Sequence, residues 1–298
     1  METKIPQPFV KWVGGKRSLL DEIISRFPEE FNTYYEPFVG GGAVYFAIAN
    51  KIKKAVLADS NLQLVLAYKV IQSDPEKLIL KLKQHAKRHS KEYYYKVRSK
   101  EDDDAINTVA RFLYLNKTCY NGLYRVNKSG KFNAPMGKYK NPNIIQEDNI
   151  LTCHSVLKNA SIRVGDFSKL KPKKDDFVYF DPPYHPTDNV SFTQYTEQNF
   201  TEKDQVRLRD FIVELHRRGV KIMLSNSKTK FIEDLYKTPY LIKHIVKAPR
   251  FVNCKSDQRG KVEELLITNY ETRHKSKLYR GSIRASNRWH YSTATGMN

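Results

Sequence analysis

One short run near the middle of the chain has the residue types needed to hold and orient an amino group. The run comprises Val178, Tyr179, Phe180, Asp181, Pro182, Pro183 and Tyr184. Its apolar residues predict a buried strand, and the two prolines end that strand just after Asp181. Ligands of open α/β sheets bind at the carboxyl ends of the strands. The sequence therefore predicts a site where a carboxylate, a proline carbonyl oxygen and an aromatic ring lie together.

These groups suit the methylation of an exocyclic amine. The lone pair of an adenine N6 amine is delocalised into the ring, so the amine is a weak nucleophile. Two acceptors, the Asp181 carboxylate and the Pro182 carbonyl oxygen, would bind its two N–H groups and direct the lone pair toward an electrophilic methyl group. The Tyr184 ring would support the base. The alternative for these residues alone is an ordinary Asp-Pro turn after a core strand.

The composition indicates a protein that binds a polyanion. The chain has 298 residues, with 52 Lys and Arg against 32 Asp and Glu, which gives a formal net charge of +20. Neutralisation of phosphate groups is the usual reason for such an excess, so nucleic acid is the expected partner. The alternative is a charged surface that serves solubility alone.

The cysteines and the apolar runs exclude several classes of protein. Cys119, Cys153 and Cys254 form no Cys-x-x-Cys pair, which argues against a disulfide framework and against a zinc site, so no metal is expected. No apolar run reaches transmembrane length, and the first residues lack the apolar stretch of a signal peptide. We therefore expect a cytoplasmic protein with no membrane partner, and a monomer in solution.

Two glycine-containing loops allow a close approach to a ligand. The first is equally an N-terminal turn with a core Trp, and the second, with its spaced acid, predicts a pocket for an adenosine-containing cofactor. Gly14 and Gly15 follow Trp12 in the first loop, and Gly40 to Gly42 lie between a predicted strand and a predicted helix in the second. The second loop, with its flanking strand and helix, has the pattern of the first β-turn-α unit of a nucleotide-binding α/β fold. A second strand ends at Asp59, about 20 residues beyond the glycines, where such folds place an acid that binds ribose.

A third predicted strand ends in an acid as well. Ile162 to Val164 is followed by Gly165, Asp166 and Phe167. Asp166 would accept a hydrogen bond from the cofactor's adenine and Phe167 would stack on its ring, although Gly-Asp alone is equally a turn. Because Asp59, Asp166 and Asp181 each close a strand, all three acids are expected at one edge of one sheet.

The stretch from Lys117 to Pro142 predicts a nucleic-acid reader. It carries six basic residues and no acid, with aromatic residues between them, and Asn127 to Gly130 is typical of a hairpin turn. Such a hairpin can enter a major groove or a base stack. Arg125 is the candidate for a guanine edge and Asn121 for another base. The alternative is a solvated, charged excursion.

Taken together, these motifs resemble the Dam-type N6-adenine-specific DNA methyltransferases, the alpha group of the D12 class. The resemblance extends to about residue 270 and includes the two glycine loops, Asp59 and the run from Asp181 to Tyr184. Its most specific part is the sequence from Tyr120 to Asn127 with the glycines, Asn133 and Pro135 that follow. That part is similar to the hairpin of members that methylate adenine in GATC.

The resemblance implies a division of the chain and a set of roles. It implies an α/β fold with a Rossmann-like methyltransferase sheet and helices on both faces. The catalytic domain would comprise residues 1–60 and 145–270, and residues 61–144 would form an inserted recognition domain with its hairpin at 118–140. Two further expectations come from the residues themselves. Residues 271–298, which depart from the family pattern, are polar and rich in Arg and Lys and predict a basic tail, and the long polar segment from His185 to Phe200 predicts a loop that covers the substrate.

The same resemblance implies S-adenosylmethionine as the cofactor and double-stranded DNA as the partner. The catalytic residues would be Asp181, Pro182, Pro183 and Tyr184. The residues expected to bind the cofactor are Trp12, Lys16, Glu36, Pro37, Phe38, Gly40, Gly42, Asp59, Asp166, Phe167 and Asp181. The residues expected to bind DNA are Lys11, Tyr120, Asn121, Leu123, Arg125, Asn133, Pro135 and Lys140.

The expected function is methyl transfer to an adenine that is flipped out of duplex DNA, in GATC. A restriction endonuclease that acts on the same site is a further expected partner, without direct contact. The alternatives are another amine, such as cytosine N4 or an RNA base, and a catalytically silent DNA-binding relative. Cytosine C5 methylation is disfavoured because it needs a thiolate, usually after a proline, and no cysteine of this chain follows one.

Overall fold

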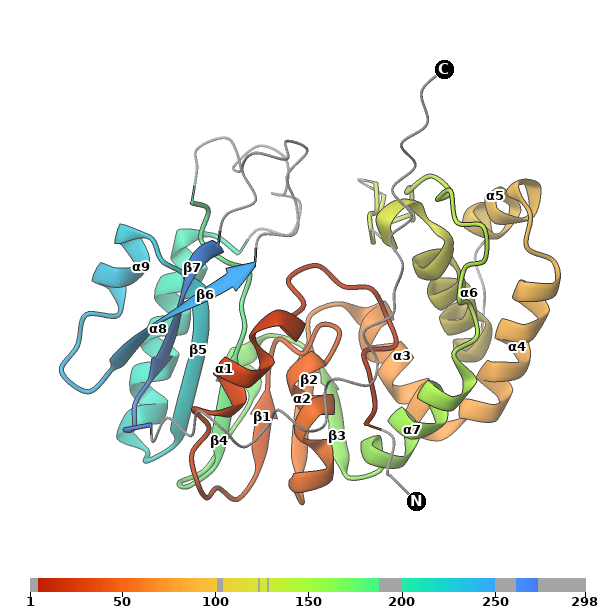
Figure 1. Ribbon diagram of the computed structural model, residues 1–298. Coiled ribbons are helices and arrows are strands. Elements are labelled where there is room, and N and C mark those ends of the chain that lie inside the picture. Colours follow the sequence, from red (N-terminus) through yellow and green to blue (C-terminus); the bar gives the residue numbers. More distant parts are fainter. Residues whose placement is uncertain are drawn as a thin grey trace.

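A single seven-stranded sheet forms the centre of the computed structural model, with strand order β3-β2-β1-β4-β5-β7-β6 (Figure 1). The structure describes residues 5–100, 104–122, 124–127, 129–187, 200–249 and 261–272. The strands are β1 Tyr34–Glu36, β2 Ala55–Asp59, β3 Ala160–Val164, β4 Phe177–Phe180, β5 Lys221–Ser227, β6 Ile242–Pro249 and β7 Lys261–Thr268.

The sheet changes direction at two places. β1 to β5 pair in parallel, whereas β7 pairs antiparallel with both β5 and β6. The chain order runs outward from β1 through β2 to β3 on one side and from β4 to β5 on the other. The point between β1 and β4 is therefore a topological switch point, where open α/β sheets bind their ligands at the carboxyl edge.

Helices cover both faces because the side chains of the central strands alternate between two cores. Tyr179 and Met223 pack on one face, and Phe180 and Leu224 on the other. The first core involves α1 Leu20–Ile24, α2 Ala43–Ile48, α3 Leu62–Ser73 and α7 Glu147–Leu157, and the second involves α8 Glu202–Arg217 and α9 Lys230–Leu235. The predicted α/β fold class, with helices on both faces of the sheet, is confirmed.

Three helices stand beside the sheet, next to α3 and α7 (Figure 1). They are α4 Pro75–Lys87, α5 Lys91–Ser99 and α6 Ala105–Thr118, and we call them the helical module. The sequence pattern predicts α4 and α6 but not α5, whose three consecutive tyrosines show no helical period. Ser90 begins α5 because its side chain accepts a hydrogen bond from the Tyr93 N–H, and Tyr94 and Val97 bury one face.

Several other expectations depend on particular segments. The sequence pattern also predicts two final strands, at 240–247 and 264–268, that pair antiparallel, and β6 and β7 pair in this way. The division of the chain into a catalytic and a recognition domain stays a prediction. Helix α3 belongs to the predicted recognition domain, yet it contacts β2 and β3 of the predicted catalytic domain as well as α4 and α6. Most of the predicted substrate-covering loop, residues 188–199, and nearly all of the predicted basic tail, residues 273–298, lie outside the described residues.

One buried amide ties the N-terminal loop to the helical module. The Asn116 side chain is fully buried near the end of α6. Its Oδ1 accepts a hydrogen bond from the Lys11 N–H at 2.8 Å, and its Nδ2 donates to the carbonyl oxygens of Lys11 at 2.9 Å and Gly122 at 3.2 Å. Asn116 therefore fixes the first glycine loop against the segment that begins the predicted DNA reader.

We expect Asn116→Ala to destabilise the protein by about 2 to 3 kcal/mol, because it leaves buried backbone groups without their partners. Urea unfolding should show a lower midpoint with an unchanged slope. The matched control is Asn50→Ala, at an exposed position, which should change the free energy of unfolding by less than about 0.5 kcal/mol. An equal loss in both variants would contradict this account of the junction.

Candidate active site

The parallel register brings four acids to the carboxyl edge of the sheet. Glu36 ends β1 and Asp59 ends β2, while Asp181 directly follows β4 and Asp166 lies two residues beyond β3. Their common edge follows from the pairing of β1 with both β2 and β4, and of β2 with β3. The expected gathering of Asp59, Asp166 and Asp181 at one edge is therefore present in the structure.

Asp181 is a mostly buried carboxylate that faces a lysine ammonium group. The Asp181 side chain is 16% exposed, and Lys16 Nζ lies 2.8 Å from its Oδ1. Burial raises the pKa of Asp181 to about 6, the Lys16 cation opposes this rise, and the nearby Glu264 carboxylate adds to it. The ammonium and Oδ1 form an ion pair, and no other hydrogen-bond donor is found for this buried oxygen among the described residues.

The Tyr184 ring lies against the same cation. Lys16 Nζ is 4.5 Å from the centroid of the ring, which is a cation–π contact. The Tyr184 hydroxyl donates a hydrogen bond of 2.8 Å to Glu264 Oε2 on β7, and burial raises the pKa of Tyr184. The structure thus places a carboxylate, a cation and an aromatic ring around one point at the switch between β1 and β4.

Glu36 is a second buried acid of this edge. It is 2% exposed, and its Oε2 accepts a hydrogen bond of 2.8 Å from the Tyr34 hydroxyl. Burial raises the pKa of Glu36 to about 8, and the neighbouring Asp181 charge adds to the effect. Glu36 is therefore mostly neutral at pH 7, which leaves Asp181 as the ionised carboxylate of the pair.

The second glycine loop packs on Trp12 and binds Asp59. Gly40 has a φ of +49°, and a Cβ at this position would lie 2.9 Å from Trp12 Cδ1, so only glycine fits. The Gly40 N–H donates to Asp59 Oδ2 at 3.0 Å, and the Asn61 N–H donates to Asp59 Oδ1 at 2.9 Å. Each Asp59 oxygen keeps a lone pair beyond these bonds, which suits a ribose hydroxyl.

Asp166 and Phe167 lie at the predicted edge but already have protein partners. Arg207 donates to both Asp166 oxygens, at 2.9 and 2.8 Å, and its guanidinium lies over the Phe167 ring. Phe167 is 2% exposed and contacts the rings of Phe38 and Phe211. Their expected roles toward the cofactor's adenine stay a prediction, and they would require Arg207 to share the Asp166 carboxylate.

Two buried amides hold the backbone that carries Tyr184. Gln205 of α8 donates from Nε2 to the Pro183 carbonyl oxygen at 3.0 Å, and its Oε1 accepts from Asn226 Nδ2 at 3.1 Å. Asn226 Oδ1 in turn accepts from the His185 N–H at 3.2 Å. Gln205 and Asn226 are both at most 1% exposed. We call this pair the amide clamp, because it fixes the loop on both sides of Tyr184.

The predicted hairpin is present in the described part of residues 118–140. Isolated antiparallel bridges join Cys119 to Met136 and Val126 to Phe132. The Asn127 side chain closes the turn by accepting from the N–H groups of Ser129 and Lys131. Leu123 lies outside the described residues, so its expected contact with DNA is untested.

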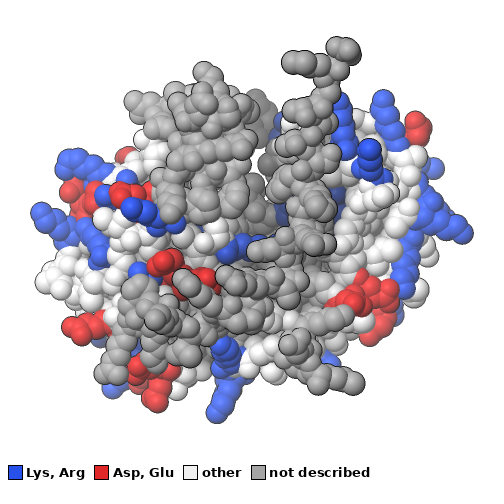
Figure 2. All heavy atoms as spheres, viewed as in Figure 1, with Lys and Arg blue, Asp and Glu red and all other residues white. Residues whose placement is uncertain are grey.

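Most of the residues expected to bind DNA are exposed. Tyr120 is 53% exposed. Phe132 and Ala134, which alternate along the hairpin with the expected DNA-binding residues Asn133 and Pro135, are buried. Arg125 donates from Nε to Asn133 Oδ1 at 2.8 Å, which holds its guanidinium beside the hairpin. The exposed members are Lys11, Tyr120, Asn121, Arg125, Pro135 and Lys140, with Asn133 half-buried. The face in Figure 2 carries basic side chains over the outer side of the helical module as well.

Lys11 joins the N-terminal loop to the hairpin. Its Nζ donates to the Tyr139 hydroxyl at 3.1 Å and lies 4.3 Å from the centroid of that ring. Its backbone is bound by Asn116, as described above. The structure thus brings Lys11 next to the predicted DNA reader, although more than 100 residues separate them in the chain.

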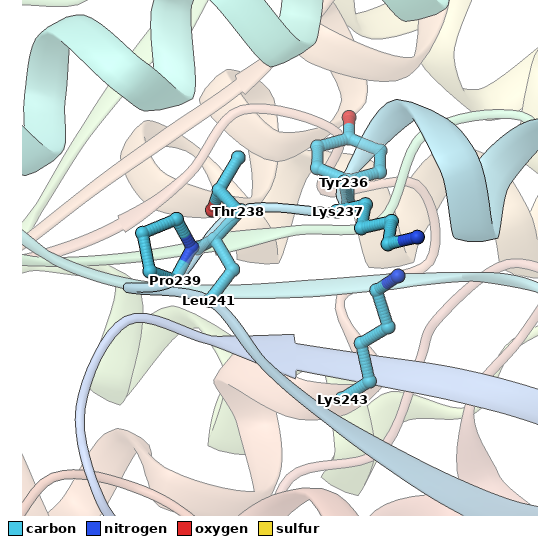
Figure 3. Close-up of a pocket in the computed structure, with 6 residues that line it drawn as sticks. All are labelled: Tyr236, Lys237, Thr238, Pro239, Leu241 and Lys243. Atoms are coloured by element: carbon cyan, nitrogen blue, oxygen red, sulfur yellow. The ribbon is translucent and has the colours of Figure 1, made fainter.

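A pocket of about 470 Å³ lies elsewhere, between α9 and β6 (Figure 3). It is lined by Tyr236, Lys237, Thr238, Pro239, Leu241 and Lys243. Because Ile242 pairs with Thr268, which in turn pairs with Met223, this pocket lies toward the amino edge of β5, away from the acids. Among the described residues, no group of three or more Asp, Glu, His or Cys side chains is arranged to hold a metal ion. No helix in the described part of the chain has the length and hydropathy of a membrane span.

Comparison with known proteins gives a family match over most of the chain. The profile of the D12 class of N6 adenine-specific DNA methyltransferases matches residues 12–251. The type II methyltransferase M.MjaIII of Methanocaldococcus jannaschii is 46% identical over 294 residues, which cover 91% of this chain and 100% of the relative. The DNA adenine methylase of Escherichia coli K12 is 32% identical, over 87% of this chain and 93% of that protein.

The chain belongs to the D12 class of N6 adenine-specific DNA methyltransferases.

This membership confirms the predicted D12 class, the predicted transfer of a methyl group to adenine N6 of DNA, and S-adenosylmethionine as the cofactor, whereas the alpha group and the GATC site stay predictions. A further relative, the type II methyltransferase M1.LlaDCHI of Lactococcus lactis subsp. cremoris, is 44% identical over 89% of this chain and 95% of its own. Among solved structures, the rRNA methyltransferase aviRa of Streptomyces viridochromogenes has a TM-score of 0.39 at 11% identity, over 88% of this chain and 90% of that one. That likeness is too low to carry an argument.

Several residues of this methyltransferase site are not predicted from the sequence. Gln205, Asn226 and Glu264 all contact the loop that follows β4, yet each lies far from it in the chain. Gln205 gives the clearest signal, because it occupies the buried stripe that Leu208, Ile212 and Leu215 define on α8. The structure places the ammonium group of Lys16 beside Asp181, a pairing that the sequence did not predict, and the expected role of Lys16 toward the cofactor stays a prediction.

We expect Gln205→Met to lower the methylation rate by about 10- to 100-fold, because a loop that shifts misplaces the reacting groups. It should also lower the free energy of unfolding by about 1 to 3 kcal/mol, since Asn226 and the Pro183 carbonyl lose a buried partner. Gln84→Met, at an exposed position of α4, is the matched control. A stability loss with an unchanged rate would show that the amide clamp supports folding alone.

Proposed function

We propose that this enzyme methylates adenine N6 in duplex DNA at GATC, with the target adenine flipped into the site between Lys16, Asp181 and Tyr184. The observation that carries the proposal is the mostly buried Asp181 at the switch point, whose carboxylate pairs with the Lys16 ammonium beside the Tyr184 ring. An ionised carboxylate has several lone pairs, so Asp181 can accept a hydrogen bond from an incoming N–H group while Lys16 remains beside it.

The chain's own residues perform three tasks in this proposal. Asp181 Oδ1 and the Pro182 carbonyl oxygen accept the two N6 hydrogens, which orients the lone pair. The Tyr184 ring stacks on the base. Flipping that base out of the duplex costs a few kcal/mol. The Lys16 cation keeps Asp181 ionised, because it opposes the rise of its pKa. The proton that N6 loses passes to solvent.

The residues at the sheet edge fit the cofactor of this family. Gly40 and Gly41 pack closely on Trp12, and Gly42 packs on Tyr68 and Phe46. Asp59 keeps lone pairs for two hydroxyls, and Glu36 lies at the end of β1 beside Asp181. We propose these residues, with Lys16, Pro37, Phe38, Asp166 and Phe167, as its binding set. When bound, S-adenosylmethionine supplies the electrophilic methyl group.

The specificity part of the proposal rests on the hairpin. Arg125 is exposed and its guanidinium is oriented by Asn133, which suits bidentate contact with a guanine edge. We propose that Arg125 reads the guanine of one base pair, that Tyr120 enters the base stack, and that Lys11, Asn121, Leu123, Asn133, Pro135 and Lys140 contact the surrounding DNA. Residues 61–144 would then act as the recognition unit.

Two partner predictions stay open within this proposal. Two of the relatives are named type II methyltransferases and another is named a DNA adenine methylase. A restriction endonuclease that acts on the same site is consistent with the name type II methyltransferase. We propose such an endonuclease as a partner that does not contact this enzyme directly. The monomeric state and the cytoplasmic location stay predictions.

Transfer of labelled methyl groups from S-adenosylmethionine tests the proposal. We expect methylation of a duplex with GATC, at least about 100-fold slower methylation of a scrambled duplex, and none of the matching RNA. Asp181→Ala should lower the rate by at least about 100- to 1,000-fold, while fluorescence anisotropy shows retained DNA binding. Equal use of the scrambled duplex would refute GATC, and normal turnover by the variant would refute the role of Asp181.

The pH dependence provides an independent check. Asp181 must be ionised to accept the N6 hydrogens, and its pKa is about 6. The value of kcat/KM for DNA, which reports the free enzyme, should therefore be constant above about pH 7 and fall as the pH drops through about 6. Lys16→Met should move this midpoint to higher pH, because the variant lacks the cation that lowers the pKa. A profile flat down to pH 5 would contradict the assignment.

A further inference from the structure

The antiparallel strand β7 brings an acid to the target-base site from the far end of the chain. Its register pairs Glu264 with Ser227, the last residue of β5. Because β7 runs against the parallel strands, its early residues lie at the carboxyl edge, where the site is. Glu264 there accepts a hydrogen bond of 2.8 Å from the Tyr184 hydroxyl.

Other contacts already fix the backbone on either side of Tyr184, so only the orientation of its side chain remains to be set. The amide clamp already binds the backbone on either side, at Pro183 and His185. A tyrosine on a fixed backbone still rotates about two side-chain torsions, and a bond at the hydroxyl, the far end of the ring, restrains both. The Lys16 ammonium contacts the face of the ring and does not restrain its hydroxyl.

We infer that Glu264 is a positioning residue for methyl transfer, which sets the tilt of the Tyr184 ring on which the target adenine stacks. The inference rests on the proposed function and extends it to a strand outside the nucleotide-binding part of the sheet. Glu264 acts through Tyr184 and contacts neither the base nor the methyl donor.

Glu264 has a second effect that a purely structural residue would lack. Its carboxylate is one of the charges that raise the pKa of Asp181. The groups that interact electrostatically with Asp181 come from four places, namely the N-terminal loop, β1, the segment from β4 to its following loop, and β7. They are Lys16, Tyr34, Glu36, Tyr179, Tyr184 and Glu264.

Two substitutions separate the hydrogen bond from the charge. Glu264→Gln keeps an acceptor for the Tyr184 hydroxyl and removes the charge, so kcat at pH 8 should stay within about 3-fold of the wild type. The acid midpoint of kcat/KM for DNA should move to lower pH. Glu264→Ala removes the acceptor, so kcat should fall by about 10- to 100-fold, with a smaller change in the KM for DNA.

A double-mutant cycle tests whether Glu264 acts through Tyr184. Tyr184→Phe keeps the ring and removes the hydroxyl, so it should reproduce the loss of Glu264→Ala, and the double variant should lose no more than either single one. The matched control is Glu263→Gln on the same strand, whose carboxylate binds Lys228 instead. It should leave both the rate and the acid midpoint unchanged, and urea unfolding checks that all variants fold.

Additive losses in the cycle, or an effect of Glu263→Gln equal to that of Glu264→Gln, would overturn the inference. Its failure is distinguishable from that of the proposed function. If Asp181→Ala is inactive while both Glu264 variants behave as the wild type, the proposed function stands and only the role of Glu264 is wrong. If Asp181→Ala is active, the site itself is wrong.

Discussion

The site depends on keeping one carboxylate charged inside the protein. Burial of an acid favours its neutral form, and an isolated buried charge costs several kcal/mol. Asp181 meets this constraint through Lys16, whose ammonium lies 2.8 Å away and is itself largely buried. Because an ionised carboxylate is a stronger hydrogen-bond acceptor than a neutral carboxyl group, the N-terminal loop that carries Lys16 supports the site together with the strand that carries Asp181.

The neighbouring acids show how environment assigns different states to similar groups. Glu36 and Asp181 end adjacent strands, yet the pKa of Glu36 is about 8 and that of Asp181 about 6. The difference follows from deeper burial of Glu36 and from the direct cation partner of Asp181. The neighbouring Asp181 charge adds to the rise in the pKa of Glu36, so repulsion between the two carboxylates is one reason why Glu36 keeps its proton to a higher pH than Asp181.

Three levels of support converge on the short loop after β4. The prolines restrict its backbone, the amide clamp from α8 and β5 binds its peptide groups, and Glu264 from β7 binds the Tyr184 hydroxyl. Each support comes from a different element of the sheet or its covering helices. A site built on rigid elements holds its groups to the tolerance that methyl transfer needs.

The cost of this arrangement is dependence on distant contacts. Asn116 binds the backbone of Lys11, and the loop from Trp12 to Lys16 then runs past Gly40 to Asp181. A change in the helical module can therefore reach the charge state of the site through a single segment of chain. The same segment places Lys11 beside the hairpin, so the DNA-reading side and the reacting side share one support.

The sequence by itself determined the fold class, the acids at the strand ends, the glycine loops and the hairpin, because each depends on local patterns of apolar, glycine and proline residues. Residues outside the described part of the structure, such as Leu123, provide no test of those predictions. Only the tertiary structure decided that Lys16 faces Asp181, that Arg207 binds Asp166, and that Glu264 reaches Tyr184. Those contacts join residues 41 to 165 positions apart in the chain. No local pattern encodes them, since they arise from the strand order and from the antiparallel direction of β7.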